Sequence, residues 1–173
     1  MKKTGLLMAG VFVLGSVVGA VAAKKGIDPS VYTGKDKKVA AKALLELARV
    51  QAGKGSWERL GVGRVYNLGG MKAEVQAIFD EVAKKGEGGD WVRIGRVYYE
   101  AGEWDKAKEA FDKALTMEPK DAPWLSEVGS YYIMKGDRAK GEEMIARSFK
   151  IEPSELWSTL DAAGAYLGIR PLR

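Results

Sequence analysis

A period of 32 to 34 residues runs through most of this sequence and constrains its fold more than any other feature. Tryptophan recurs along the chain, and a tyrosine and a glycine follow it in each unit. The repeated positions are Trp57, Trp91, Trp124 and Trp157, then Tyr66, Tyr98, Tyr132 and Tyr166, and finally Gly70, Gly102 and Gly136. Self-similarity of this length is typical of repeat proteins, whose units bury their apolar faces only by stacking on one another.

The apolar spacing inside a unit is helical, with residues three or four positions apart on one face. The first stripe of the clearest unit consists of Trp91, Ile94, Tyr98 and Ala101. A second stripe follows Gly102 and consists of Ala107, Phe111, Ala114 and Leu115. Because Pro119 prevents the second helix from continuing, each unit is predicted to be two antiparallel helices joined by a tight turn. Asp121 and Ser154 are predicted to cap the helices that follow them.

The unit from Trp91 to Pro119 resembles a tetratricopeptide repeat. That family places an aromatic residue, a Leu-like residue, a glycine and a tyrosine on the first helix, then two alanines around a phenylalanine and a closing proline. This unit supplies Trp91, Ile94, Gly95, Tyr98, Ala107, Phe111, Ala114 and Pro119. The next unit supplies Leu125, Val128, Gly129, Tyr132, Gly141, Ile145, Ser148 and Pro153. Gly141 stands where the family has alanine, at a cost in helix propensity of about 1 kcal/mol.

The units at the two ends are incomplete. The unit before Trp91 is a shorter copy that ends in residues 85–89 instead of a proline, and this junction is predicted to be the loosest. Residues 43–50 match a second helix without a first, and residues 154–167 match a first helix without a second. The resemblance therefore implies an all-α fold, a right-handed α-α superhelix (solenoid) of about three tetratricopeptide-like helix pairs with flanking single helices. In the last helix, Glu155, Ser158 and Asp161 are predicted to form a thin polar cover.

The N-terminal segment differs from the repeats. Lys2 and Lys3 precede an uncharged stretch over residues 5–23, and small residues at positions 20–22 fit a cleavage site. We predict a signal peptide over residues 1–22. An uncleaved membrane anchor and a buried helix remain the alternatives, since about 20 apolar residues can span a bilayer. Either export route places the remainder outside the cytoplasm, so we predict the bacterial periplasm, or an inner-membrane anchor facing it.

The predicted domain organisation follows from these two patterns. Residues 23–36 carry Gly, Pro, Ser and Asp without apolar periodicity and are predicted to be a linker. Residues 37–173 are predicted to form the repeat domain. Its repeats are expected at about 56–87, 88–121 and 122–155, followed by a terminal helix at 155–168.

Composition argues against an enzyme. The 173 residues include no cysteine and no histidine, which removes thiol nucleophiles, sulfur-bound zinc and the commonest general base. Neighbouring carboxylates such as Glu142 and Glu143 point about 100 degrees apart on a helix and do not converge. We therefore predict a non-catalytic protein with no cofactor and no metal. The net charge of +5 comes from interspersed charges rather than one basic face, so no nucleic acid partner is predicted.

The resemblance implies a protein–protein interaction module whose first helices line a concave groove for a peptide or protein segment. Matched positions predict the groove residues Arg64, Asn67, Arg96, Tyr99, Ser130 and Ile133. The arginine fork suits carboxylates, so a partner with acidic groups is expected, although two ordinary solvated arginines are the alternative. We predict an exported scaffold or adaptor in cell-envelope assembly. The alternative is a membrane-anchored structural subunit of an envelope complex that stacks through its terminal helices. Membrane contact is expected only if the N-terminal segment is retained.

The tryptophans carry two further predictions. The four in the repeated column are predicted to pack in the core rather than to bind a sugar or a quaternary ammonium group. Trp104 lies outside that column, just after the Gly102 turn. Packing and exposure to a partner both remain open for it.

Overall fold

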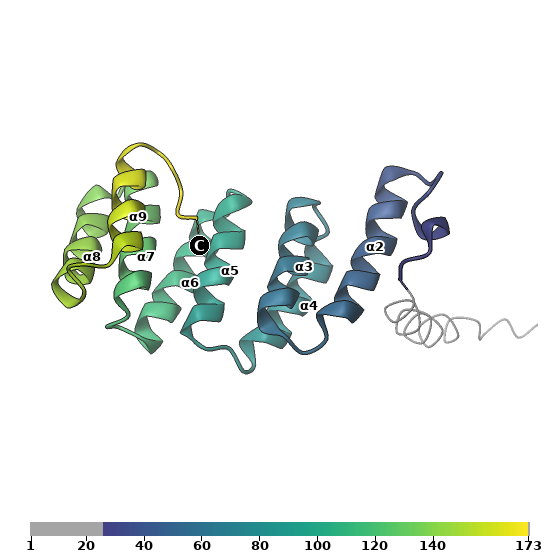
Figure 1. Ribbon diagram of the computed structural model, residues 1–173, viewed down its shortest axis with the longest axis horizontal. Coiled ribbons are helices and arrows are strands. Elements are labelled where there is room, and N and C mark those ends of the chain that lie inside the picture. The colour runs from purple at the N-terminus through teal and green to yellow at the C-terminus, as the bar shows by residue number, and fades with distance from the viewer. Residues whose placement is uncertain (1–25, 173) are drawn as a thin grey trace, which may run out of the picture. The chain divides into compact units, whose positions relative to one another are not determined.

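The computed structural model describes residues 26–172, and within that range every regular element is a helix (Figure 1). A short 3-10 helix, η1 (Pro29–Val31), lies inside the segment predicted to be a linker. The α-helices are α2 (Lys37–Ala52), α3 (Ser56–Leu68), α4 (Lys72–Ala83), α5 (Gly88–Glu100), α6 (Trp104–Met117), α7 (Ala122–Met134), α8 (Arg138–Ile151) and α9 (Leu156–Tyr166). The predicted all-α fold of short helix pairs is confirmed.

The turns within the helix pairs are made by the glycines of the repeated column. Gly70, Gly102 and Gly136 have φ values of 77°, 76° and 92°, in the left-handed region that favours glycine at a helix end. Asp121 caps α7 as predicted, because its carboxylate accepts a hydrogen bond of 2.9 Å from the backbone N–H of Trp124. The prediction for Ser154 is wrong. Glu155 caps α9 instead, since its longer side chain reaches back to the backbone N–H of Ser158.

The chain divides into two compact units between Ile78 and Phe79, inside α4. In unit 1, α2 packs on η1 and on α3. Tyr66 is buried, and its hydroxyl lies 3.4 Å from the Glu46 carboxylate. Burial in the first place, and then this carboxylate, raises the pKa of Tyr66 to about 12. The hydroxyl therefore stays protonated as a buried donor.

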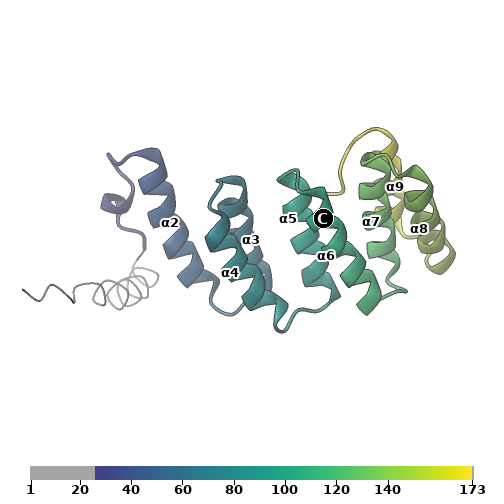
Figure 2. The same ribbon diagram turned by 180° about the vertical axis from the view of Figure 1, so that it is seen from behind.

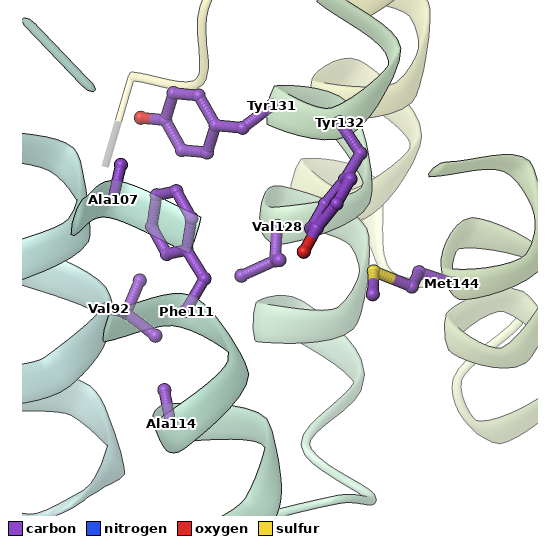
Figure 3. Packing of buried hydrophobic residues seen from close by; sticks show 8 residues of the cluster. All are labelled: Val92, Ala107, Phe111, Ala114, Val128, Tyr131, Tyr132 and Met144. Atoms are coloured by element: carbon purple, nitrogen blue, oxygen red, sulfur yellow. The ribbon is translucent and has the colours of Figure 1, made fainter. Parts of the chain in front are cut away.

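In unit 2, α5 pairs with α6 and α7 pairs with α8, while α9 lies against α7 (Figures 1 and 2). The core between the pairs consists of Val92, Ala107, Phe111, Ala114, Val128, Tyr131, Tyr132 and Met144 (Figure 3). The ring of Phe111 is fully buried and stacks on that of Tyr131 with centroids 5.0 Å apart. Burying an aromatic side chain of this size stabilises a fold by about 1.5–3 kcal/mol.

Two glycines allow α7 and α8 to approach closely. A Cβ atom on Gly141 would lie 2.5 Å from the backbone oxygen of Gly129, and one on Gly129 would lie 2.8 Å from the oxygen of Gly141. Distances below 3 Å from Cβ to backbone are essentially absent from real structures. Gly141 therefore serves the helix contact, and the interpretation of this position as a simple loss of helix propensity was incomplete.

The tryptophan column does not behave as one set. Trp91 and Trp124 are partly buried against the core of unit 2 as predicted. Trp57 and Trp157 are 60% and 50% exposed, so the core prediction is wrong for them. Trp57 lies in the first turn of α3, and Trp157 lies on α9, which no second helix covers. Trp104 packs on the core, with its ring edge-on to Tyr132 at 5.1 Å.

The buried and exposed sides of the terminal helix α9 are the reverse of those predicted. Ser158 and Asp161 are buried, and the Ser126 hydroxyl of α7 donates a hydrogen bond of 2.7 Å to the Ser158 carbonyl. The exposed side carries the large apolar residues Leu156, Trp157, Leu160, Tyr166 and Leu167. This inversion arises because α9 uses its polar residues to contact α7 and has no second helix over its apolar side.

Two expectations concern membranes. The segment predicted to be a signal peptide or anchor, residues 1–22, lies outside the described residues. Within residues 26–172, no helix combines the length and the apolar character needed to cross a membrane.

Candidate functional site

The six predicted groove residues fall into both units. Arg64 and Asn67 belong to unit 1, where Arg64 is exposed on α3. Asn67 is buried and accepts a hydrogen bond of 2.6 Å from the Lys72 ammonium. The other four residues belong to α5 and α7 of unit 2, and only among these can the structure test proximity.

Arg96 is the centre of a buried ion pair. Its guanidinium donates two hydrogen bonds to the carboxylate of Glu127 on α7, one from Nε to Oε1 and one of 2.6 Å from Nη2 to Oε2. The Glu127 side chain is 0% exposed and that of Arg96 is 19% exposed. Burial alone would lower the pKa of Arg96, but the Glu127 carboxylate raises it overall, so the guanidinium stays charged. A two-pronged contact of this kind is strong and fixes the two helices in register.

Ser130 and Ile133 take part in contacts within the α7–α8 pair. Ser130 is fully buried, and its hydroxyl donates a hydrogen bond of 2.8 Å to the carbonyl of Ser126. Ile133 lies next to Gly141 of α8, since a Cβ added to that glycine would meet its Cγ1 atom. Ligand binding by these two residues stays a prediction.

Tyr99 does lie beside the Arg96 ion pair, as part of an aromatic group. Its ring centroid is 4.6 Å from that of Tyr131 and 6.2 Å from that of Trp104. The Lys135 ammonium lies over the Tyr99 ring, 5.1 Å from its centroid. Burial raises the pKa of Tyr131, and the Glu127 carboxylate adds to this effect. Arg96, Tyr99, Glu127 and Tyr131 thus form one cluster on α5 and α7, in which Glu127 and Tyr131 are buried. We call this cluster the α5–α7 face.

Asp161 and Glu127 were missed as members of this site. Asp161 is buried on α9 and acts electrostatically on both Arg96 and Tyr131. A signal for both acids exists in the sequence, because positions 127 and 161 are 34 residues apart, one repeat period. These two acids lie on the first helices α7 and α9, and both act electrostatically on Arg96.

The segment after α9 contacts the end of α5, next to the α5–α7 face. The chain turns at Gly168, which has a φ of 72°, and residues 169–172 run back from α9 toward α5 (Figures 1 and 2). The Arg170 guanidinium pairs with the Glu100 carboxylate at the end of α5. Its charge also reaches Tyr99, although burial raises the pKa of Tyr99 overall. Pro171 is buried. We call residues 169–172 the closing segment.

The face combines a charge-paired carboxylate, an arginine and aromatic rings. Groups of these kinds are able to orient a peptide chain. In the part of the chain that the structure describes, no three His, Cys, Asp or Glu side chains are grouped so as to hold a metal ion.

Consecutive antiparallel helix pairs define a helical-repeat protein. The tetratricopeptide repeat family model matches residues 89–121, which cover α6 and all of α5 except its first residue. This match supports the resemblance drawn from Trp91 to Pro119. No curated protein matches the chain.

Proposed function

We propose that this protein is a non-catalytic interaction module that binds a segment of a partner protein on the α5–α7 face. Tetratricopeptide repeats generally bind proteins or peptides, and residues 89–121 match that family. The observation that carries the proposal is that a piece of chain without regular secondary structure, the closing segment, already lies beside this face and pairs Arg170 with Glu100 at the end of α5. A region that holds one such segment has polar groups that can hold another.

Site-specific crosslinking tests this function. A photo-reactive amino acid at Tyr99, in the full chain and in a chain ending at Gly168, is expected to give an adduct with one discrete partner protein in cells. Glu109, exposed on α6, provides the matched control position and should give no such adduct. Absence of the adduct from both chains, or the same adduct from Glu109, contradicts the proposed binding face.

We also propose that the protein is exported and acts as a scaffold or adaptor in cell-envelope assembly. The support is the order of Lys2 and Lys3, an uncharged stretch and small residues at positions 20–22. In fractionated cells, the intact mass and N-terminal sequence should show a soluble periplasmic chain beginning near Ala23. A cytoplasmic chain that keeps Met1 contradicts export.

The second candidate function is a membrane-anchored structural subunit that stacks through its terminal helices. The exposed apolar side of α9, which carries Leu156, Trp157 and Leu160, favours this function because no helix within residues 26–172 covers it. The same fractionation separates the two candidates, since an anchored subunit is found in membranes with Met1 retained.

The expected acidic partner stays a prediction. Arg64 is exposed on α3, as a carboxylate ligand requires. At Arg96 an acidic ligand has to compete with the buried Glu127 carboxylate, which already takes two guanidinium donors.

A further inference from the structure

We propose that the α5–α7 face, together with Glu100 at the end of α5, is a binding site for a basic segment in which an arginine precedes a proline. We further propose that the closing segment, Ile169 to Leu172, occupies this site in cis. This inference rests on the proposed function, because it names the partner class of the same face. It replaces an acidic ligand by a basic one in unit 2.

Charge on the face favours a basic occupant. Arg96 is neutralised by Glu127, and α9 adds the buried carboxylate of Asp161. Glu100, whose side chain is 14% exposed, takes the guanidinium of Arg170. A partner arginine placed like Arg170 gains the same charge-assisted contact, whereas a carboxylate placed there meets Glu100 as a like charge.

The backbone conformation directly after α9 positions the closing segment. The Ile169 N–H donates a hydrogen bond of 2.8 Å to the carbonyl of Gly164, and Gly168 adopts the left-handed conformation between them. This is the arrangement with which many helices end. A Cβ on Gly164 would lie 2.8 Å from the Ile169 carbonyl oxygen. The position of the closing segment therefore depends on two glycines. At Gly164 a side chain would collide with Ile169, and at Gly168 the backbone has a positive φ.

Pro171 is buried, whereas Ile169, Arg170 and Leu172 are exposed. Pro171 has no N–H group, so its burial leaves no backbone donor without a partner. Proline-containing segments commonly bind beside aromatic rings. Tyr99 supplies a partly buried ring within electrostatic reach of Arg170.

Because the closing segment of the same chain occupies the site, a partner segment has to compete with it for binding. A short tether gives the closing segment an effective concentration of the order of millimolar, so a partner segment of equal intrinsic affinity binds the full chain poorly. A partner gains access when its own segment has more contacts or a second attachment point. Removing the closing segment is therefore expected to raise the affinity for a short peptide about tenfold or more.

A peptide-binding experiment tests the proposal. The probe is a fluorescein-labelled peptide of sequence Gly-Ile-Arg-Pro-Leu-Arg, that of residues 168–173, and the readout is fluorescence anisotropy. We expect saturable binding to the chain ending at Gly168 and binding about tenfold or more weaker to the full chain. The full chain with Gly164→Ala should bind like the shortened chain. A peptide with Glu in place of its first Arg should bind about tenfold or more weaker, through loss of a charge-assisted contact.

A pair of matched substitutions identifies the carboxylate. In the shortened chain, Glu100→Gln is expected to weaken peptide binding about tenfold or more, and Glu109→Gln on α6 to leave it unchanged. The proposal is overturned if the shortened chain does not bind the peptide, if the Glu-containing peptide binds equally well, or if Glu100→Gln has no effect.

Hydrogen exchange on the full chain provides a second measurement that does not depend on the shortened chain being folded. Glu100→Gln is expected to speed exchange of the Ile169 amide, which is hydrogen-bonded to Gly164, about tenfold or more relative to the Glu109→Gln chain. Equal exchange in the two variants overturns occupancy in cis. If the peptide fails to bind while Tyr99 still gives its partner adduct, the ligand class is wrong and the interaction module stands. If the adduct also fails, the proposed function is wrong as well.

Discussion

Replacing Arg96 with methionine is expected to lower the free energy of unfolding by about 3–5 kcal/mol. The substitution keeps an unbranched side chain of similar length but leaves the Glu127 carboxylate, which is 0% exposed, without its two guanidinium donors. A buried charge that loses its partner destabilises the fold, because the ion pair no longer offsets the free-energy cost of removing the charge from water. Urea denaturation followed by circular dichroism at 222 nm measures the change.

Two control variants separate the ion pair from the general effect of removing an arginine. Arg64→Met alters the exposed arginine that occupies the matched position in unit 1, and it should change stability by less than about 0.5 kcal/mol. The double variant Arg96→Met with Glu127→Leu should recover most of the loss, since apolar residues often replace a buried ion pair at little cost. A double variant as unstable as Arg96→Met alone contradicts this account.

Most of the fold could be predicted because the information is local and repeated. One apolar stripe per helix, a glycine at 102 that reaches a positive φ, and a capping aspartate at 121 each act within a few residues. Their repetition at one period specified successive helix pairs without knowledge of any distant contact. Ser154 shows the limit of this approach. The longer side chain of its neighbour Glu155 caps the same helix, and the sequence pattern does not rank the two.

The candidate site was harder to predict because it depends on contacts between repeats. Alignment to the family placed Arg96 on the groove face, but its partner Glu127 lies 31 residues further along and on the next first helix. Periodicity shows that positions 127 and 161 share a column. Only the stacking of α5, α7 and α9 shows that this column faces Arg96. The closing segment carries no repeat signal, so nothing in the periodic pattern indicated that Arg170 reaches Glu100.

The exposure of apolar residues on α9 also depends on contacts between helices. Tyr166 follows Tyr132 by one period, and by pattern alone both belong to the same buried column. Tyr132 is buried between Trp104 of α6 and Lys140 of α8, whereas no helix follows Tyr166 in the described residues and its side chain is exposed. Burial in a repeat protein is thus a property of a residue and its neighbouring helix together.

Replacing Gly141 with alanine is expected to destabilise the protein by about 1–3 kcal/mol, the usual range for overpacking. Helix propensity alone predicts the opposite sign, a gain of about 1 kcal/mol for alanine over glycine within a helix. The added Cβ would lie 2.5 Å from the Gly129 carbonyl oxygen, which is backbone and cannot rotate away. α7 and α8 therefore have to separate, and the buried contacts of Met144 and Ile145 weaken with them. Thermal and urea denaturation measure the change.

Gly61→Ala provides the matched control, because Gly61 also lies inside a helix, α3, but a Cβ there would meet nothing within 4 Å. This variant should realise the propensity gain and stabilise the protein by about 0.5–1 kcal/mol. The two substitutions are chemically identical and differ only in what lies beyond the new methyl group. If Gly141→Ala lowers the stability and Gly61→Ala raises it, the loss at Gly141 is therefore due to the close approach of α7 and α8. A gain in stability for Gly141→Ala contradicts that approach.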